Sequence, residues 1–126
     1  MVRRRFSGFT LIELLVVLAI LGLLLSIASP KYFRSVDASK EAVLAENLHI
    51  TRAAIDHFYA DRGRYPESLD ELVVRRYLRA LPVDPLADNV STWAVVAPPQ
   101  GLEGRIADLK SRAPGVGRNG RPYAQW

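Results

Sequence analysis

The chain has 126 residues and a formal net charge of +4, with 17 lysines and arginines, 13 acidic residues and no cysteine. This length suits one membrane helix plus one small domain, and the lack of cysteine excludes disulfides and thiolate metal sites. Arg3, Arg4 and Arg5 supply three of the basic residues, and removing them leaves 14 against 13 acidic residues, so charge gives no reason to expect a nucleic-acid partner.

A long apolar run follows these arginines. It extends from Phe9 to Ser29, and Glu13 is its only charged residue. A helix of this length measures roughly 31 Å, about the thickness of the hydrocarbon core of a bilayer. The sequence therefore predicts a membrane-spanning and assembly helix over residues 9–30, with the arginine-rich end in the cytoplasm and the C-terminal domain exported.

The position of Glu13 in this run points to a function, because inserting a carboxylate near the centre of a membrane helix costs about 2.5–3.5 kcal/mol. It follows Phe9 by four residues, so the two share a helix face. If the chain were cut between Gly8 and Phe9, the new amino group would be a cation within reach of the carboxylate. Pairing would then remove the large cost of an isolated charge in apolar surroundings.

The segment from Gly8 to Leu14, GFTLIEL, resembles the processing site of type IV pilins and of type II secretion pseudopilins. This resemblance implies that a prepilin peptidase removes the basic leader, residues 1–8, by cutting after Gly8. It implies that Phe9 is then N-methylated. It also implies that Glu13 of one subunit neutralises the amine of Phe9 on a neighbour when a fibre assembles.

Gly22 and Pro30 are the weak points of the apolar helix, because glycine costs about 1 kcal/mol relative to alanine and proline removes a backbone hydrogen bond. The resemblance implies that the helix stretches or melts near such residues when subunits pack. The alternative is that lipid and neighbouring helices tolerate both residues.

Other interpretations of the N-terminal segment are an ordinary signal peptide cut at Ser26-Ile27-Ala28, a twin-arginine signal at Arg3-Arg4, and an uncut anchor. The apolar run is longer than the usual core of a signal peptide, and an ordinary signal leaves Glu13 without a role. The pilin-like interpretation is therefore favoured.

Between residues 35 and 61 apolar residues recur at helical spacing, and Gly63 is a typical C-terminal stop. Arg52 and Asp56 are predicted to pair at i, i+4. His49 and His57 lie roughly on one face, but no third ligand is evident, so they are interpreted as solvated or interfacial residues. One long helix is expected, with one stripe packed against the domain of residues 31–126.

The rest of this domain is predicted to hold a short helix and two strands. Ser68 and Glu71 form a capping box that opens a helix through about Tyr77. Strands are expected at 92–97 and 104–109, and turns at 82–89 and 98–101. The predicted fold class is α+β and pilin-like, with a long N-terminal helix packed against a small antiparallel sheet.

The tail, residues 111–126, contains Gly115-x-Gly117-x-x-Gly120, which has the spacing of a dinucleotide fingerprint. Only six residues follow, too few for the helix and acid that such a site requires. The tail also resembles the C-terminal loop of major pseudopilins, which can hold calcium, but it has Asn119 where an acid would be more convincing. No cofactor is expected, and the loop is predicted to be pinned by Tyr123 and Trp126, with structural calcium as the open alternative.

The sequence gives no support for a catalytic function, since the chain has neither a Gly-x-Ser-x-Gly elbow nor a cysteine nucleophile. The resemblance implies a structural subunit, most like the major pseudopilins, that polymerises into the pseudopilus of a type II secretion system and drives export of folded proteins. The alternative is a type IV pilus subunit for adhesion, motility or DNA uptake. No nucleic acid is expected to bind, because the dispersed arginines of the tail are interpreted as solvated.

The implied partners are further copies of the chain, the prepilin peptidase, the assembly platform with its ATPase, and minor pseudopilins. The implied location is the inner membrane, with the N-terminus in the cytoplasm and the C-terminal domain and the assembled fibre in the periplasm.

Overall fold

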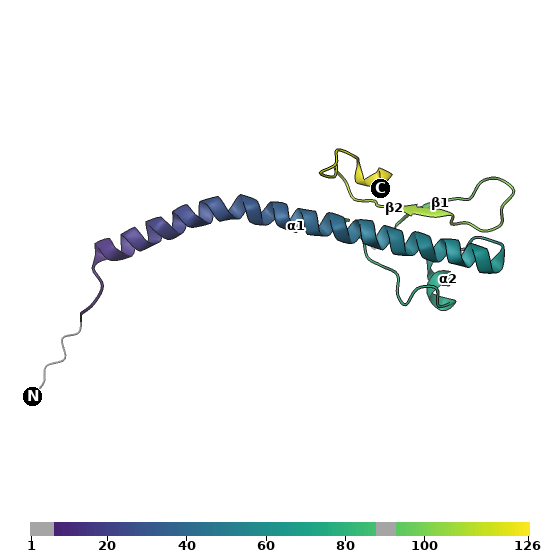
Figure 1. The fold of residues 1–126 in the computed structure, drawn as a ribbon, viewed down its shortest axis with the longest axis horizontal. Helices are drawn as coiled ribbons and strands as arrows, with labels where there is room; N and C mark the ends of the chain where they lie inside the picture. The colour runs from purple at the N-terminus through teal and green to yellow at the C-terminus, as the bar shows by residue number, and fades with distance from the viewer. Residues whose placement is uncertain (1–6, 88–92) are drawn as a thin grey trace, which may run out of the picture. The chain divides into compact units, whose positions relative to one another are not determined.

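The computed structural model describes residues 7–87 and 93–126. Its elements, in chain order, are helix α1 (Leu11–Arg62), helix α2 (Leu69–Val74), strand β1 (Ala94–Val96), strand β2 (Asp108–Lys110) and the 3-10 helix η1 (Tyr123–Gln125) (Figure 1). The chain forms two compact units, Met1–Asp37 and Ala38–Trp126. The predicted α+β fold, with a long N-terminal helix and a small antiparallel sheet, is confirmed.

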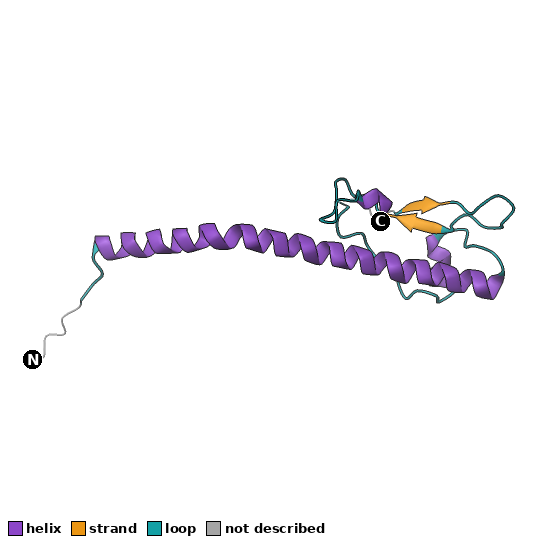
Figure 2. Ribbon diagram, turned by 45° about the horizontal axis from the view of Figure 1, so that its top comes forward, coloured by secondary structure: helices purple, strands orange, loops and turns teal. Residues whose placement is uncertain are grey.

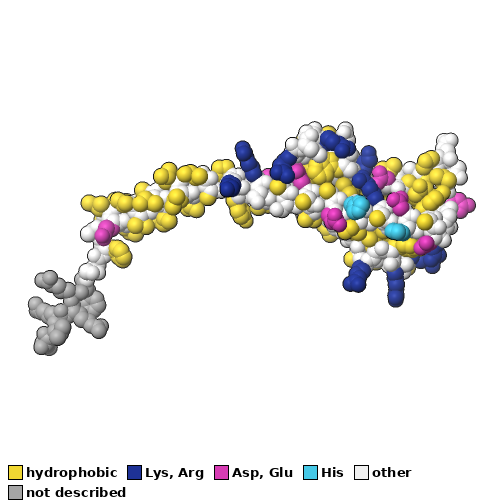
Figure 3. All heavy atoms as spheres, in the orientation of Figure 1, with side chains coloured by type: hydrophobic (Ala, Val, Ile, Leu, Met, Phe, Trp, Pro, Cys, Tyr) yellow, Lys and Arg dark blue, Asp and Glu magenta, His cyan; other side chains and the backbone are white. Residues whose placement is uncertain are grey.

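The first unit contains the apolar part of α1. Every large apolar side chain from Phe9 to Ile27 is exposed, and Figure 3 shows hydrophobic side chains all along this part of the helix on the face in view. The helix is long and apolar enough to cross a membrane, with a mean hydropathy of 2.8 in its most apolar window. As predicted, it continues through Pro30 as one element. Exposure of this kind suits a segment that meets lipid or other helices rather than water.

The second unit is built around the other half of α1. Leu44, Leu48, Ile55 and Phe58 are almost fully buried and follow the helical repeat predicted for the apolar stripe. They pack in one core with residues of α2, of β2 and of the segments beside these elements, namely Leu69, Leu72, Leu78, Trp93, Ile106 and Leu109. Val43, which the pattern also placed on the stripe, is 49% exposed and is not part of this core.

Helix α2 begins where predicted and ends three residues early. The Ser68 side chain accepts a hydrogen bond from the backbone N–H of Glu71, which is one half of the predicted capping box, while the Glu71 carboxylate accepts the N–H of Glu67 rather than that of Ser68. At the other end Arg76 adopts a left-handed φ of 64°. Its N–H donates to the carbonyl of Val73, and the N–H of Tyr77 donates to that of Leu72, the pattern of a Schellman motif. The left-handed residue therefore stops the helix before Tyr77.

The sheet has two antiparallel strands with Val95 opposite Leu109 (Figure 2). The second strand is shorter than predicted, because the N–H groups of Arg105 and Ile106 donate to the carbonyl of Pro66 instead of to β1. Ile106 and Leu109 both lie in the core. Residue 92 of the first predicted strand, and the Asp88-Asn89 turn, fall outside the described residues.

Candidate functional site

The residues predicted for processing and assembly lie at the start of α1. Thr10 precedes the helix, and its hydroxyl accepts a hydrogen bond from the N–H of Glu13 at 3.2 Å. In return, Oε2 of Glu13 accepts the N–H of Thr10 at 3.0 Å. This reciprocal pair is a capping box. The Thr-x-x-Glu spacing signals this box in the sequence, but the sequence-based prediction treated Glu13 only as a partner for the amine of Phe9.

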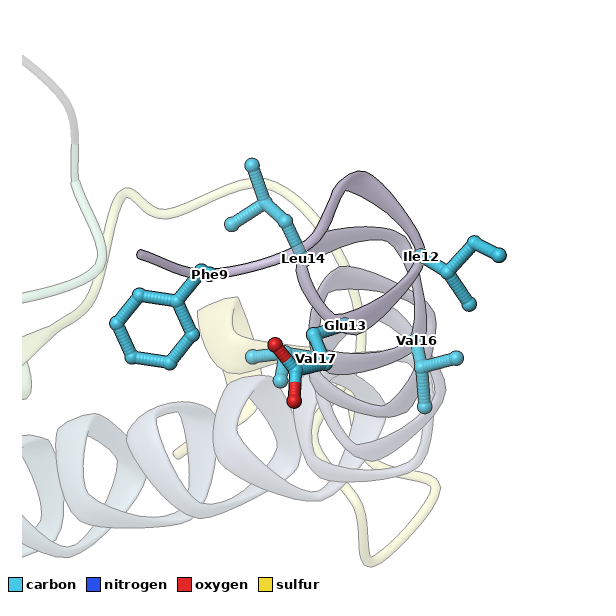
Figure 4. A pocket seen from close by; sticks show the side chains of 6 residues that line it. All are labelled: Phe9, Ile12, Glu13, Leu14, Val16 and Val17. Carbon is cyan, nitrogen blue, oxygen red and sulfur yellow. The ribbon is translucent and has the colours of Figure 1, made fainter. Parts of the chain in front are cut away.

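The capping box holds the Glu13 carboxylate at the N-terminal end of the helix, where the helix dipole favours a negative charge. It lies against a shallow groove of about 510 Å³ lined otherwise by apolar side chains, namely Phe9, Ile12, Leu14, Val16 and Val17. Figure 4 shows the carboxylate beside Val17, with the Phe9 ring nearby. The site therefore combines one negative charge, held in place by the capping box, with an exposed apolar surface. This combination suits contact with an apolar helix that carries an amine.

Gly8 and Gly22 lie in open space, with no atom within 4 Å of a Cβ built at either position. Packing within the chain therefore does not require glycine at either place. Pro30 lies inside α1. The processing role of Gly8 and the flexibility of Gly22 and Pro30 stay predictions.

The predicted pairing of Arg52 with Asp56 is wrong. The Arg52 Nε lies 2.7 Å from Oδ1 of Asp108 in β2, and its Nη2 donates to the carbonyl oxygens of Leu109 and Trp126. An i, i+4 pair on a helix contributes only a few tenths of a kcal/mol, whereas this guanidinium makes three charge-assisted bonds in one place. A partner 56 residues away has no local signature in the sequence.

His49 and His57 are exposed on α1, consistent with solvated or interfacial residues. Within residues 7–87 and 93–126, no group of three or more histidine, cysteine or acidic residues is arranged to hold a metal ion.

The tail does not fit the calcium ion that the resemblance suggested. Two carboxylates contact the tail, and both already have donors: Glu41 of α1 accepts hydrogen bonds from Arg118 and Tyr123, and Asp84 accepts one from the hydroxyl of Ser111. The Asn119 side-chain oxygen accepts the N–H of Arg121. Calcium takes six to eight oxygen ligands, with carboxylates prominent. The side-chain oxygens of Glu41, Asp84 and Asn119 already accept hydrogen bonds from groups of the chain itself.

Comparison with known proteins supports the motif and extends beyond it. Residues 3–29 match the family model of the prokaryotic N-terminal methylation motif. The chain is similar to type II secretion system core protein G of Pseudomonas aeruginosa, with 36% identity over 101 residues that cover 68% of this chain and 71% of the relative. Core protein G of Klebsiella michiganensis is 27% identical over 140 aligned positions, covering 98% and 95% of the two chains.

Type IV pilins are also similar to this chain. The type IV major pilin protein PilA of Myxococcus xanthus is 37% identical over 68 residues, covering 54% of this chain and 31% of the relative. No solved structure matches the chain significantly. The similarity to core protein G therefore extends through the folded domain, whereas the similarity to PilA covers about half of the chain.

Proposed function

This chain belongs to the type II secretion system core protein G family of pseudopilins, and on that premise we propose that its residues from Phe9 onward assemble into a pseudopilus that drives export of folded proteins across the outer membrane. The observation that carries the proposal is the combination of the methylation motif with a similarity to core protein G that runs through the folded domain. The assembled form is a fibre of many copies, and the chain acts as a structural subunit rather than as an enzyme.

The proposed pathway begins with insertion of the apolar helix, with Arg3 to Arg5 in the cytoplasm. A prepilin peptidase cuts after Gly8, and Phe9 is methylated. The assembly ATPase and platform, together with minor pseudopilins, then move the subunits from the inner membrane into the periplasmic fibre. Packing of the apolar helices supplies most of the association energy, while Glu13 pairs with the amine of Phe9 on a neighbour and sets the register.

The first experiment is the intact mass and N-terminal sequence of the chain purified from membranes. We expect a chain that starts at Phe9 and carries one extra methyl group. A start at Ser29 would indicate an ordinary signal peptide, and retention of residues 1–8 would indicate an uncut anchor. Either of these two results would remove the proposed function.

A second prediction concerns Glu13→Ala. Insertion should persist, because removing a charge lowers the cost of burying the helix. Assembly should fall by about 100-fold or more, because an amine left unpaired in apolar surroundings costs about 3–5 kcal/mol. Negative-stain counting of fibres measures the loss, and carbonate extraction checks insertion. Glu46→Ala is the matched control, since Glu46 is an exposed carboxylate elsewhere on α1. Normal fibre numbers in Glu13→Ala would contradict the assigned role.

The second candidate function is that of a type IV pilus subunit, favoured by the similarity to PilA. Deleting the gene for this chain in its own host distinguishes the pseudopilus function from the pilus function. Loss of folded exported proteins from the medium, with surface fibres retained, supports the pseudopilus. Loss of surface fibres with normal export would support the pilus instead.

A further inference from the structure

Glu41 is a carboxylate on α1 that is only 7% exposed. Its Oε1 accepts the backbone N–H of Arg118 at 3.0 Å and the hydroxyl of Tyr123 at 2.8 Å. Its Oε2 accepts the Nε of Arg118 at 3.1 Å. Three donors from a tail some 80 residues away therefore converge on one helix carboxylate.

Arg52 lies eleven residues further along α1, which is close to three helical turns, so it faces the same side as Glu41. It donates at 2.7 Å to the carbonyl oxygen of Trp126, in the same tail, and to Asp108 of the strand that leads into it. Glu41 and Arg52, an anion and a cation on one face of α1, therefore each bind a different part of the tail. We name these two residues the charge clasp.

The tail is shaped to meet the charge clasp. Val116 and Pro122 form a β-bridge, and the N–H of Gly120 donates to the carbonyl of Gly117. This narrow turn presents Arg118 at its tip. A Cβ at Gly117 would lie 2.4 Å from the Trp126 ring, so the turn can close against that ring only because this residue is glycine. Within the dinucleotide-like motif, Gly117 is therefore required by packing against Trp126.

We propose that Arg118, paired with Glu41 of the charge clasp, takes the place of a bound divalent cation in this chain, so that the tail folds on the chain's own charges and does not need calcium. A carboxylate as buried as Glu41 must be paired, and Arg118 is a good partner because 66% of its own side chain stays exposed to solvent. The tail then supplies the positive charge that a metal ion would otherwise bring. Tyr123 and the Arg118 N–H satisfy the remaining acceptor capacity of the carboxylate.

The test is thermal unfolding of the processed full-length chain in detergent, followed by tryptophan fluorescence, with calcium chloride or with a chelator. We expect the same Tm in both conditions. We expect Glu41→Gln to lower the Tm by about 5 °C or more, because the charge-assisted bonds weaken and no cation compensates. Glu46→Gln is the matched control, an exposed carboxylate on the same helix, and should leave the Tm unchanged.

Trypsin cleavage after Arg112 gives a second readout that reports on the tail alone. We expect the tail of Glu41→Gln to be cut about tenfold faster than that of Glu46→Gln. If Glu41→Gln fails to fold, Arg118→Gln leaves the helix unchanged and should lower the Tm in the same direction. A Tm raised by several degrees in calcium, or a tail equally protected in the Glu41 and Glu46 variants, would overturn the proposal. Neither readout depends on fibre assembly, so the proposed function can fail separately.

Discussion

At the scale of single residues, Gly104 shows how closely two loops approach. It has a φ of +105°, and a Cβ built there would lie 2.2 Å from the carbonyl oxygen of Tyr65. The neighbouring Glu103 carbonyl accepts the N–H of Tyr65 at 2.8 Å, so the two segments cannot separate without losing a backbone hydrogen bond. A side chain at this position therefore conflicts with backbone atoms rather than with a movable side chain.

Gly104→Ala and Gly101→Ala form a matched pair that tests this contact. Gly101 also has a positive φ, +91°, but has open space around it. We expect Gly101→Ala to cost about 1–2 kcal/mol, the usual penalty for a non-glycine residue in this region. Gly104→Ala should cost at least twice as much, because a steric conflict adds to the same backbone strain. Urea unfolding measures both, and equal losses would contradict the close approach.

At the scale of elements, α2 has only six residues and depends on contacts at its ends. The carboxylate of Glu71, in its first turn, accepts hydrogen bonds from Nη2 of Arg64 at 2.6 Å and from the backbone N–H of Glu67 at 2.9 Å. The bond from the Arg64 guanidinium and then that from Glu67 hold the pKa of Glu71 below its ordinary value of 4.5. Sequence reasoning identified the capping residue Ser68, but the arginine that holds Glu71 lies seven residues before it and outside the helix.

Glu71 should therefore make stability depend on pH in a defined direction. Its folded pKa is below the ordinary one, so its contribution is complete above about pH 4.5 and is lost as pH falls through the folded pKa. The Tm difference between the wild-type chain and Glu71→Gln should be constant from about pH 7 to 5.5 and should shrink in stronger acid. A difference that grows on acidification would mean that the carboxylate is not stabilised in its ionised form.

At the scale of the whole molecule, the two units differ in whether their apolar side chains are buried within the chain. The domain buries one cluster of apolar residues around the second half of α1. The first half of α1 leaves its large apolar side chains exposed, and burial in lipid or against other copies is what stabilises such a surface. A subunit that moves between a membrane and a fibre needs this combination, because each setting covers the same helix in turn. The domain can keep its fold during the transfer because its core is complete within the second unit.

The sequence by itself determined an apolar run long enough to span a membrane, the Gly8-Phe9 and Glu13 motif, the family, the continuous helix and the α+β class. These features follow from hydrophobic periodicity and from spacings of a few residues, which are local properties of a chain. The Thr10–Glu13 capping box was equally local and could have been found. Only the tertiary structure decided the partner of Arg52, the shortening of the second strand by Pro66, and the convergence of Arg118 and Tyr123 on Glu41. These contacts join residues tens of positions apart, and folding alone brings the groups together.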